Sequence, residues 1–442
     1  MASPNHSPSQ SPSPPADPFA ELIEPFSRRG VNLGLERLQA ALADLGHPER
    51  RFAAVQVAGS NGKGSICTLV HQSLLAAGLH AGFYSSPHLV SWTERIRIGA
   101  ADIAAAELRQ QLQAAAGAAA RHNLTPFELV TAAAFLAFAA AGCELVVLEV
   151  GLGGRLDATT CHPDRSVIGL ASIGLDHREF LGPDLASIAT EKAGVLRPGA
   201  VALSAPQPPA AAAVLERQAR AVGAELRWLE PLAQAADGAL LIDGQWCPCG
   251  LPGSLQAANG AVAIGMLQAL AERGWSISAA ACRQGFAAAR WPGRLQQLSW
   301  RGMPLLLDGA HNPPAAEALR RELDAHPQRH GLSGGPRHWL LGMLASKQGP
   351  EILEALLAEG DQAWIVPVPA HASWSRAQLV AARPELAGQL LEAADLEQAV
   401  ALAQRANASK RLVVAGSLYL IGALLSSATP NNNPSAERSR QI

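Results

Sequence analysis

Residues 52–77 constrain the fold more than any other segment, because an apolar run, a glycine-rich turn and a helical pattern follow one another directly. The run FAAVQVA at 52–58 contains two valines and is typical of a buried strand. The turn GSNGKGS follows at 59–65, and apolar side chains then recur at helical spacing as far as Leu74. A strand, a glycine turn and a helix together aim free backbone N–H groups at a phosphate. The sequence therefore predicts a nucleotide-phosphate site.

The side chains of this turn fit that chemistry. Its glycines let the main chain approach a phosphate, Lys63 supplies a mobile positive charge, and the Ser65 hydroxyl can ligate Mg²⁺. The turn is a variant of the usual phosphate loop, because Val57 stands where its first glycine is expected and Gly64 separates the lysine from the serine. An ordinary glycine turn with a solvated lysine is the alternative. We expect ATP to be held by Gly59, Ser60, Asn61, Gly62, Lys63, Gly64 and Ser65.

Composition narrows the class of protein. With 442 residues the chain is long enough for two domains, and its net charge of −2 suggests neither a nucleic-acid nor a membrane-surface partner. Its six cysteines are scattered except for Cys247 and Cys249, which lack the second pair that a zinc site needs. Free thiols in a reducing cytosol are expected. The expected protein is cytoplasmic and is treated as a monomer, although the sequence does not indicate the subunit number.

The chain ends and the longest apolar stretch give no reason to expect a membrane protein. Residues 1–18 are rich in Ser and Pro and lack the basic start and apolar core of a secretory signal. We expect disordered tails there and at 427–442. The apolar stretch 129–143 is shorter than the roughly 20 residues that span a bilayer, and it reads as a buried helix.

Polar side chains stand at or after the ends of three further strand candidates: Ser86 for 81–84, Glu149 for 144–150 and His177 for 166–173. A carboxylate near the end of an apolar strand is costly to bury unless something pairs with it. In P-loop proteins a second strand commonly ends in an acid that holds or orients Mg²⁺. Ligands of open α/β sheets bind at the carboxyl ends of strands, so we expect these three groups near the phosphate loop. A polar turn at Ser86 and a surface position for His177 are the alternatives.

A second α/β alternation begins after the boundary turn WPGR at 291–294. Strands are expected at 304–308, 338–342, 363–366 and 412–415, with helices between them. The first of these strands leads into a further polar group, Asp308 and His311. The predicted fold class is α/β, with a P-loop NTPase-like parallel-sheet ATP-binding domain at 19–296 and a smaller Rossmann-like C-terminal domain at 297–426.

Together these segments closely resemble the folylpolyglutamate synthase/dihydrofolate synthase family, the folate-specific members of the Mur-ligase group. The matching segments run in order along nearly the whole chain outside the tails: GSNGKGS (59–65), SSPHL with ERIRI (85–98), TPFELVTAAAF (125–135), LEVGLGGRLDAT (148–159), GLDH (174–177), EKAGVLRPG (191–199), PGR (292–294), DGAHNP (308–313) and GSLYLIG (416–422). The segment NLGLER at 32–37 is similar to one in members that also carry dihydrofolate synthase activity. Leu255 and Ser346 depart from the family pattern, in which a His and an Asp are usual.

The resemblance implies a ligase that adds L-glutamate to dihydropteroate, giving dihydrofolate, and to tetrahydrofolates. ATP would convert the acceptor carboxylate into an acyl phosphate and leave as ADP, with Mg²⁺ as the metal. The implied Mg²⁺ ligands are Ser65, Ser86, Glu149 and His177. The implied catalytic residues are Lys63, Lys192, Arg294 and His311, and further nucleotide contacts are Asn259, Arg294 and Asp308.

The folate ring needs a flat apolar partner, for which Phe127 is the best-placed aromatic residue, with Trp92, Pro87 and His88 near it. The resemblance also implies that Lys192 is carbamylated and so becomes carboxylate-like. From the residues alone, a solvated lysine beside Glu191 would be preferred.

Two other functions stay open. One is an amide ligase of the same architecture that acts on a nucleotide-linked sugar peptide, and the other is a nucleotide-binding regulator that has lost catalysis. The segments SSPHL and ERIRI favour a folate ligase over the first. The second is disfavoured by the retention of Lys63, Ser65, Glu149, His177, Lys192 and Arg294.

Overall fold

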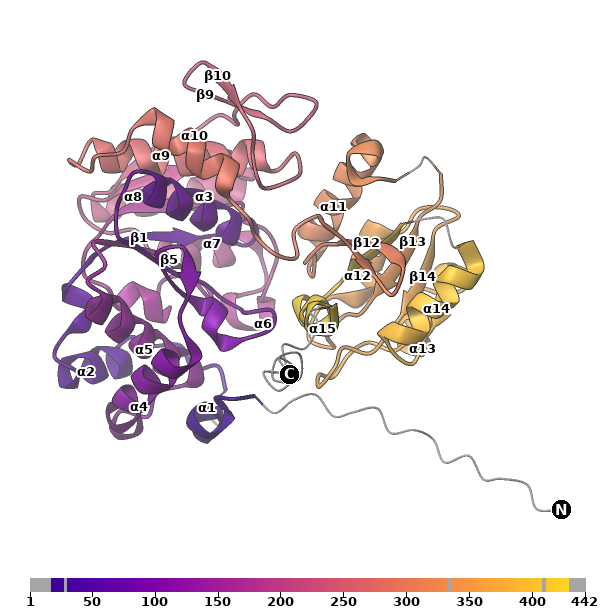
Figure 1. The fold of residues 1–442 in the computed structure, drawn as a ribbon, viewed down its shortest axis with the longest axis horizontal. Coiled ribbons are helices and arrows are strands. Elements are labelled where there is room, and N and C mark those ends of the chain that lie inside the picture. The colour runs from indigo at the N-terminus through magenta and orange to yellow at the C-terminus, as the bar shows by residue number, and fades with distance from the viewer. Residues whose placement is uncertain (1–16, 28–29, 333–334, 408–410, 429–442) are drawn as a thin grey trace, which may run out of the picture.

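Two α/β lobes make up the computed structural model (Figure 1), which describes residues 17–27, 30–332, 335–407 and 411–428. The tails expected at 1–18 and 427–442 fall mainly on residues outside this described part. The last helix, α15 Leu418–Ala428, continues past the limit expected for the second domain at 426.

The first lobe is built around an eight-stranded sheet with the strand order β4-β3-β2-β5-β1-β6-β7-β8. Its strands are β1 Ala53–Ala58, β2 Ala81–Tyr84, β3 Ile96–Ile98, β4 Ala101–Asp102, β5 Leu145–Glu149, β6 Arg165–Leu170, β7 Val201–Ser204 and β8 Glu225–Trp228. Within this sheet the six neighbouring strands β2-β5-β1-β6-β7-β8 are parallel. Of these, the sequence predicts β1, β2, β5 and β6. β1 lies in the middle and is buried beyond Ala53, as its apolar run indicates.

The edge formed by β3 and β4 is antiparallel, in contrast to the parallel sheet that the sequence predicts. The 3₁₀ turn η2 Trp92–Arg95 is the regular structure between β2 and β3. A parallel neighbour would need a crossover of about a dozen residues or more, usually a helix. The short connection therefore brings the chain back antiparallel beside β2.

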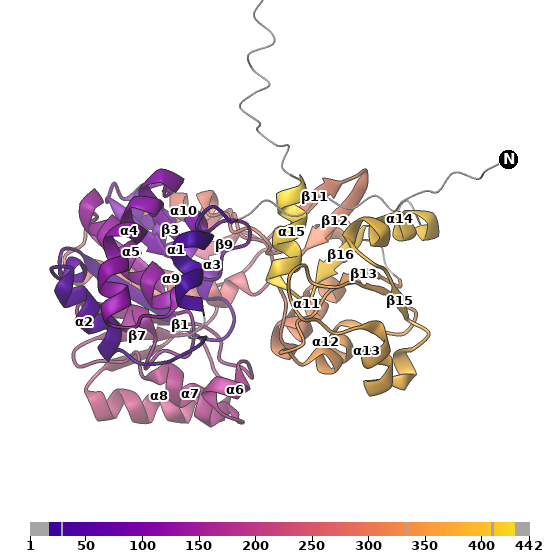
Figure 2. The same cartoon turned by 90° about the horizontal axis from the view of Figure 1, so that it is seen from below.

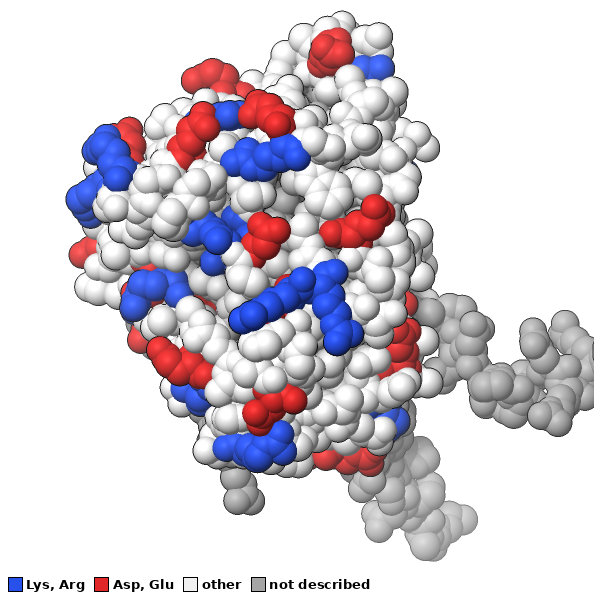
Figure 3. Space-filling model, turned by 90° about the vertical axis from the view of Figure 1, so that its left-hand side faces the viewer, with Lys and Arg blue, Asp and Glu red and all other residues white. Residues whose placement is uncertain are grey.

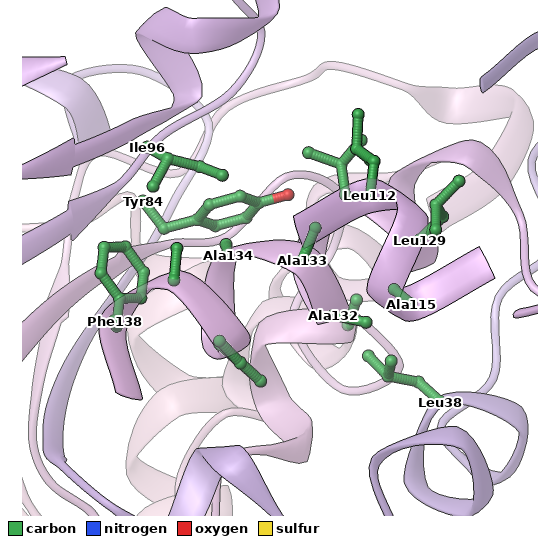
Figure 4. Close-up of a cluster of buried hydrophobic side chains, with 14 of the residues drawn as sticks. Leu38, Tyr84, Ile96, Leu112, Ala115, Leu129, Ala132, Ala133, Ala134 and Phe138 are labelled. Carbon is green, nitrogen blue, oxygen red and sulfur yellow. The ribbon is translucent and has the colours of Figure 1, made fainter. Parts of the chain in front are cut away.

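Helices cover both faces of this sheet. On the face that receives Val55 and Val57 lie α3 Lys63–Ala76, α9 Gln256–Ala271 and α10 Ala279–Ala288. On the opposite face lie α1 Ala20–Ser27, α2 Glu36–Asp44, α4 Ala105–Arg121, α5 Pro126–Ala141, α7 Leu185–Ala193 and α8 Pro209–Val222, with the short α6 Arg178–Leu181 before α7. Figure 4 shows part of this second core, which brings together Tyr84, Leu112, Leu129 and Phe138.

The apolar stretch 129–143 forms a buried helix, as predicted. Residues 129–141 of it lie in α5, which begins with a capping box in which Thr125 and Glu128 bond to each other's backbone N–H groups. Gly142 ends the helix with a φ of 69°. Within the described ranges, no helix is long and apolar enough to cross a membrane. Figure 3 shows basic and acidic side chains interspersed on the outer face of this lobe, in keeping with the small net charge.

The second lobe contains a six-stranded sheet with the order β11-β12-β16-β13-β14-β15. Its strands are β11 Gln296–Trp300, β12 Met303–Leu307, β13 His338–Leu341, β14 Gln362–Ile365, β15 Leu390–Glu392 and β16 Leu412–Ala415. The sequence predicts β12, β13, β14 and β16 but neither edge strand. β11 is antiparallel because the turn at Arg301 and Gly302, with φ of 51° and 78°, folds it into a hairpin with β12.

The helices of the second lobe are α11 Pro313–Ala325, α12 Gly349–Leu356, α13 Arg376–Ala382, α14 Leu396–Asn407 and α15. Smaller elements are the hairpin β9 Leu240–Ile242 with β10 Gln245–Cys247 and the 3₁₀ turns η1 Pro48–Arg50, η3 Ala158–Cys161, η4 Pro327–His330 and η5 Pro384–Leu386.

The chain passes from the first lobe to the second through residues 289–295, and the two lobes lie side by side (Figure 2). The loop after β2 also reaches across, because Leu89 packs against the core of the second lobe, which includes Ile421. A Cβ atom on Gly422 of α15 would lie 1.9 Å from the Leu89 carbonyl oxygen. Glycine at this position therefore allows the loop to contact the helix backbone.

Candidate active site between the two lobes

A cavity of about 680 Å³ lies between the lobes and is lined by both. The first lobe contributes the turn after β1, the loop after β2 and the end of β5, and the second contributes residues after β12, β13 and β16. These are carboxyl ends of parallel strands, the expected place for a ligand. The predicted site residues that line the cavity are Ser60, Asn61, Gly62, Lys63, Gly64, Ser86, Pro87, Phe127, Glu149, His177, Arg294 and His311. Those that do not line it are Gly59, Ser65, His88, Trp92, Lys192, Asn259 and Asp308.

The glycine turn adopts the geometry that a phosphate loop requires. Gly59 and Gly62 have φ of 144° and 97°, values that other residues rarely adopt, and α3 begins at the next residue, Lys63. The Ser60 hydroxyl donates to the Gly174 carbonyl at 2.8 Å and fixes the turn to the loop after β6. The Lys63 ammonium donates to carbonyls of the turn itself, 3.1 Å from Gly59 O and 3.2 Å from Ser60 O. In this structure the lysine is therefore folded back onto the turn.

Asn259 supports the turn from outside the cavity. A Cβ atom on Gly62 would lie 2.5 Å from the Asn259 Oδ1 atom, so this side chain packs directly against the turn. Its Nδ2 group donates to Gln256 Oε1 at 3.2 Å in the first turn of α9. Asn259 thus supports the phosphate loop by packing against Gly62.

The additional glycine of the variant loop, Gly64, has a steric explanation. A Cβ atom at this position would lie 2.7 Å from the indole ring of Trp291, which belongs to the segment between the lobes. Trp291 also packs against Phe83 of β2, with ring centroids 5.6 Å apart. The connecting segment therefore forms one wall of the phosphate loop, and the loop needs a glycine there.

We expect Gly64→Ala to lower stability by about 1–3 kcal/mol, because the indole or the loop must move to admit a methyl group. A weaker affinity for ATP should accompany it, measured by calorimetric titration beside a chemical unfolding curve. Gly117→Ala is the matched control, since Gly117 lies exposed in α4 with its nearest neighbour atom at 3.6 Å. That exchange should leave ATP affinity unchanged and raise stability by about 0.5–1 kcal/mol. Equal ATP binding by both variants would contradict the steric account.

Glu149 and Ser86 meet at the edge of the sheet beside the phosphate loop. β5 lies between β1 and β2, so its last residue, Glu149, comes next to the loops that follow both neighbours. The Ser86 backbone N–H donates to Glu149 Oε2 at 3.4 Å. Burial raises the pKa of Glu149 to about 7, although Lys63 acts in the opposite direction. A buried carboxylate with one weak donor suits a ligand of positive charge.

His177 lies at the same edge, in the loop that follows β6. It has a φ of 50° and precedes the short helix α6, and its side chain is 36% exposed, so it faces the cavity rather than the core. Burial lowers the pKa of His177 to about 4, which keeps the imidazole neutral and able to bind a metal. In the described part of the chain, no group of three or more His, Cys, Asp or Glu side chains is arranged so that it could hold a metal ion by itself. A divalent cation held here would need hydroxyl and phosphate oxygens besides Glu149 and His177, which suits a hard cation such as Mg²⁺.

Lys192 is buried, so the interpretation as a solvated lysine beside Glu191 is wrong. It lies in the last turn of α7 with 4% of its surface exposed, and its ammonium donates to Gly59 O at 2.8 Å. Glu191 instead pairs with Arg155 at 2.8 Å. Burial, together with repulsion from Lys63, lowers the pKa of Lys192 to about 7. The structure thus places an amine with a lowered pKa in contact with the backbone of the phosphate loop.

The second lobe brings Arg294 and His311 to the cavity. His311 bonds through Nδ1 to Gly309 O at 2.7 Å, and a Cβ atom on Gly309 would lie 2.2 Å from the Arg294 guanidinium. Asp308 is a predicted nucleotide contact, and its two oxygens accept backbone N–H groups of Leu295 at 3.1 Å and Ala310 at 3.0 Å. In this structure Asp308 fixes the segment that carries Arg294.

Comparison with known proteins agrees with this site. Residues 293–427 match a family model described as the C-terminal domain of dihydrofolate synthetase. The chain is 34% identical over 391 residues to the dihydrofolate synthase/folylpolyglutamate synthase of Escherichia coli, covering 86% of this chain and 85% of that protein. It is 31% identical over 429 residues to the dihydrofolate synthetase of Saccharomyces cerevisiae, covering 89% and 97%. The chain belongs to the dihydrofolate synthase/folylpolyglutamate synthase family.

Solved structures of family members share the whole two-lobed fold. Escherichia coli FolC in complex with DHPP and ADP matches with a TM-score of 0.81 and 31% identity, covering 96% of this chain and 99% of that one. The bifunctional enzyme of Yersinia pestis complexed with AMPPNP and Mn ion matches with a TM-score of 0.78 and 32% identity, covering 95% and 99%. The predicted family and α/β class are confirmed, and the chain is an ATP-dependent ligase. The two alternatives, a sugar-peptide ligase and an inactive regulator, are thereby set aside.

The residues predicted for the folate are only partly at the cavity of this family member. Phe127 lines it, and a Cβ atom on Gly151 would lie 2.6 Å from the Phe127 ring and 3.2 Å from Ser86 Oγ. His88 and Trp92 do not line the cavity, whereas Arg95, which contacts both, does. The Arg95 Nε group donates to His88 Nδ1 at 2.9 Å, and its guanidinium lies 4.4 Å from the Trp92 ring centroid. Arg95 thus faces the cavity where these two residues were predicted to lie.

Several cavity residues lie outside the predicted set: Asn32, Arg95, Thr125, Glu128, Asp157, Asp176, Lys347 and Tyr419. The capping box in TPFE was a usable signal, because Glu128 is 3% exposed and pairs with Arg37 of the NLGLER segment at 3.0 Å. Of the two departures from the family pattern, Ser346 lines the cavity beside Lys347. Leu255 is 52% exposed at the start of α9.

Proposed function

We propose that this ligase adds L-glutamate both to dihydropteroate and to tetrahydrofolates in the single cavity between its lobes. One observation carries the proposal: a phosphate loop, a buried metal-binding edge and an aromatic wall line the same cavity. The acceptor acid would have its carboxylate beside Ser86 and Glu149 and its ring beside Phe127, which lies near Ser86 at Gly151. The shared cavity predicts competition between the two acceptors.

The phosphate end would bind the triphosphate of ATP. The N–H groups of the turn and the Lys63 ammonium supply positive charge to the β- and γ-phosphates. Bound Mg²⁺ would neutralise the charge of the γ-phosphate, held by Ser86, Glu149 and His177, which line the cavity, and by Ser65, which is buried in the first turn of α3 next to Gly64. Asn259 would act through the loop that it supports, and Asp308 through the segment of Arg294.

The reaction has two steps in this cavity. A carboxylate oxygen of the acceptor attacks the γ-phosphorus and the bond to ADP breaks, which gives an acyl phosphate. The amino nitrogen of glutamate then attacks the acyl carbon, the carbon–oxygen bond to phosphate breaks, and the nitrogen loses a proton. Arg294 and His311 approach from the second lobe, so they can complete the site only when the lobes are together. Such an enclosed site would protect the acyl phosphate from water.

Lys192 supports this chemistry as a carbamate. A neutral, buried amine can attack CO₂ and release a proton, which turns a cation into an anion 2.8 Å from the backbone of the phosphate loop. The anion would orient the loop or the metal, whereas an ammonium at the same place would repel the metal. Burial and the lowered pKa of about 7 favour the neutral amine that this reaction needs.

The direct test is incubation with ATP, Mg²⁺, glutamate and either dihydropteroate or tetrahydrofolate, with the products identified by mass and released phosphate counted. One added glutamate per phosphate is expected with each acceptor, and each acceptor should inhibit the use of the other. A UDP-linked sugar acid serves as the negative control. Absence of phosphate release with both folate acceptors would contradict the proposal.

Arg294→Ala should uncouple ATP hydrolysis from ligation, because the variant loses a charge that approaches the γ-phosphate from the second lobe. A loss of about 10²-fold in the ligation rate is expected, with phosphate released in excess of product. The control is Arg290→Ala in the same connecting segment, since the guanidinium of Arg290 bonds to carbonyls of Ala287 and Ala289. Unchanged rate and coupling in the Arg294 variant would rule out this role.

A further inference from the structure

A polar cluster joins the two lobes at the phosphate end of the cavity, and its centre is Asp176. The two oxygens of this carboxylate both bond to the second lobe: Oδ1 accepts from Lys347 Nζ at 2.6 Å and Oδ2 from Asn312 Nδ2 at 2.9 Å. The His311 ring lies 3.9 Å from Oδ2. One backbone donor of its own lobe, the His177 N–H group, lies 2.9 Å from Oδ1.

Asn312 extends this cluster to the phosphate loop. Its side chain and that of Asn61 bond to each other in both directions, at 3.1 and 3.2 Å. Its Oδ1 atom also caps α11 by accepting the Ala315 N–H group at 2.9 Å. We call Asp176, Asn312, Lys347 and Asn61 the clasp. Asn312 and Asp176 are buried, at 0% and 4% exposure, so the bond between them is shielded from water, whereas the bonds of Lys347 and Asn61 are partly buried beside the cavity.

We propose that Asp176 is a positioning residue for the ligase reaction: its carboxylate holds Lys347 and Asn312 of the second lobe beside the phosphate loop. The inference rests on the proposed function, because it assigns the clasp to keeping the lobes together around the acyl phosphate. Asp176 directly precedes His177, so the lobe contact and the metal-binding edge share one short loop. Loss of the clasp should therefore separate the lobes and lower the use of glutamate, which is the last substrate to react.

A second contact indicates that α11 fixes the position of the second lobe relative to the first. Glu322, on the same helix as the Asn312 cap, accepts the Ser254 N–H group of the first lobe at 2.7 Å and His330 Nε2 at 2.7 Å. The helix is thus attached to the first lobe at its start and near its end. Breaking the attachment at Asn312 leaves the one at Glu322, which predicts a pivoting of the lobe rather than its unfolding.

The test uses Asn312→Asp, which keeps the side-chain size and the cap of α11 but replaces the donor to Asp176 with a second carboxylate. We expect a larger radius of gyration by small-angle X-ray scattering and a kcat/KM for glutamate lowered by about 30-fold or more. In the double variant Asp176→Asn/Asn312→Asp, donor and acceptor exchange places, and both readouts should return most of the way to the wild type. Asp44→Asn, an exposed aspartate paired with Arg121 and His122, controls for the loss of one carboxylate and should change neither.

The double variant separates two roles of Asp176. In one, Asp176 positions the second lobe across the interface, and in the other it acts only locally beside His177. If the exchange of donor and acceptor is as impaired as Asn312→Asp alone, the clasp is rejected. It is likewise rejected if Asn312→Asp leaves both readouts unchanged. Should Asn312→Asp fail to fold, Lys347→Gln leaves the cap of α11 intact and must give the same two changes. The radius of gyration needs no substrate, so it tests the clasp even if wild-type enzyme proves inactive with folates.

Discussion

Lys192→Ala is expected to lose about 10²- to 10³-fold in kcat, and added acetate or formate should restore part of it. The reason is the place of this side chain, which lies buried behind the phosphate loop with its nitrogen 2.8 Å from Gly59 O. Removing a group that orients charge at a transferring phosphoryl group has an effect of this size. A short carboxylate can enter the space left by the lysine and replace the carbamate.

The same role gives a dependence on pH and CO₂. Carbamate formation consumes the neutral amine and releases a proton, so it increases as pH rises through the Lys192 pKa of about 7. With that pKa, about one tenth of the amine is neutral at pH 6 and about nine tenths at pH 8. Enzyme freed of CO₂ should therefore regain activity to a greater extent at pH 8 than at pH 6, at equal dissolved CO₂. Lys192→Arg is the control, because it keeps a cation that cannot form a carbamate. Normal activity of Lys192→Ala, or no rescue by carboxylates, would count against this role.

Glu149→Gln should lower the rate of phosphate release by about 10³-fold, since it removes the negative charge from the edge at which we propose that Mg²⁺ is held but keeps the side-chain shape. The Mg²⁺ concentration for half-maximal rate should rise as well, measured by titration with the metal at saturating ATP. Glu144→Gln provides the control at the other end of the same strand, where Glu144 accepts the His80 N–H group at 2.8 Å on the surface. A Glu149 variant with unchanged metal dependence would show that Glu149 does not hold the metal.

Most of the parallel core of both sheets could be predicted from the sequence, because its strands are short apolar runs bounded by glycine or polar turns, although β7 lies outside the predicted segments. β1, β2, β5 and β6 agree with the predicted segments to within a few residues. The edge strands could not be predicted in this way. β11, with the sequence QQLSW, is half polar because one face meets solvent, and its direction depends on the two-residue turn that follows it.

The position of a site residue could be predicted where the end of one strand fixes it. It could not be predicted where the position depends on how separate helices and strands pack together. Ser86, Glu149 and His177 come together because neighbouring parallel strands end at the same edge. The burial of Lys192 depends on how α7 packs beneath β1, which no local pattern reveals. Asp176 gains its partners only from the arrangement of the two lobes, and the orientation of the loop after β2 turns Trp92 away from the cavity.

The contact between Trp291 and Gly64 bears on whether the halves of this enzyme can be separated. A fragment ending at residue 290 would keep every strand of the eight-stranded sheet, yet it would leave the glycine at the start of α3 open to water. Such a truncated half should bind nucleotide poorly even when it folds. The first lobe can therefore contain a complete sheet and still lack a residue that its phosphate loop needs. A chimaera that exchanges lobes between family members would have to include Trp291 with the first lobe.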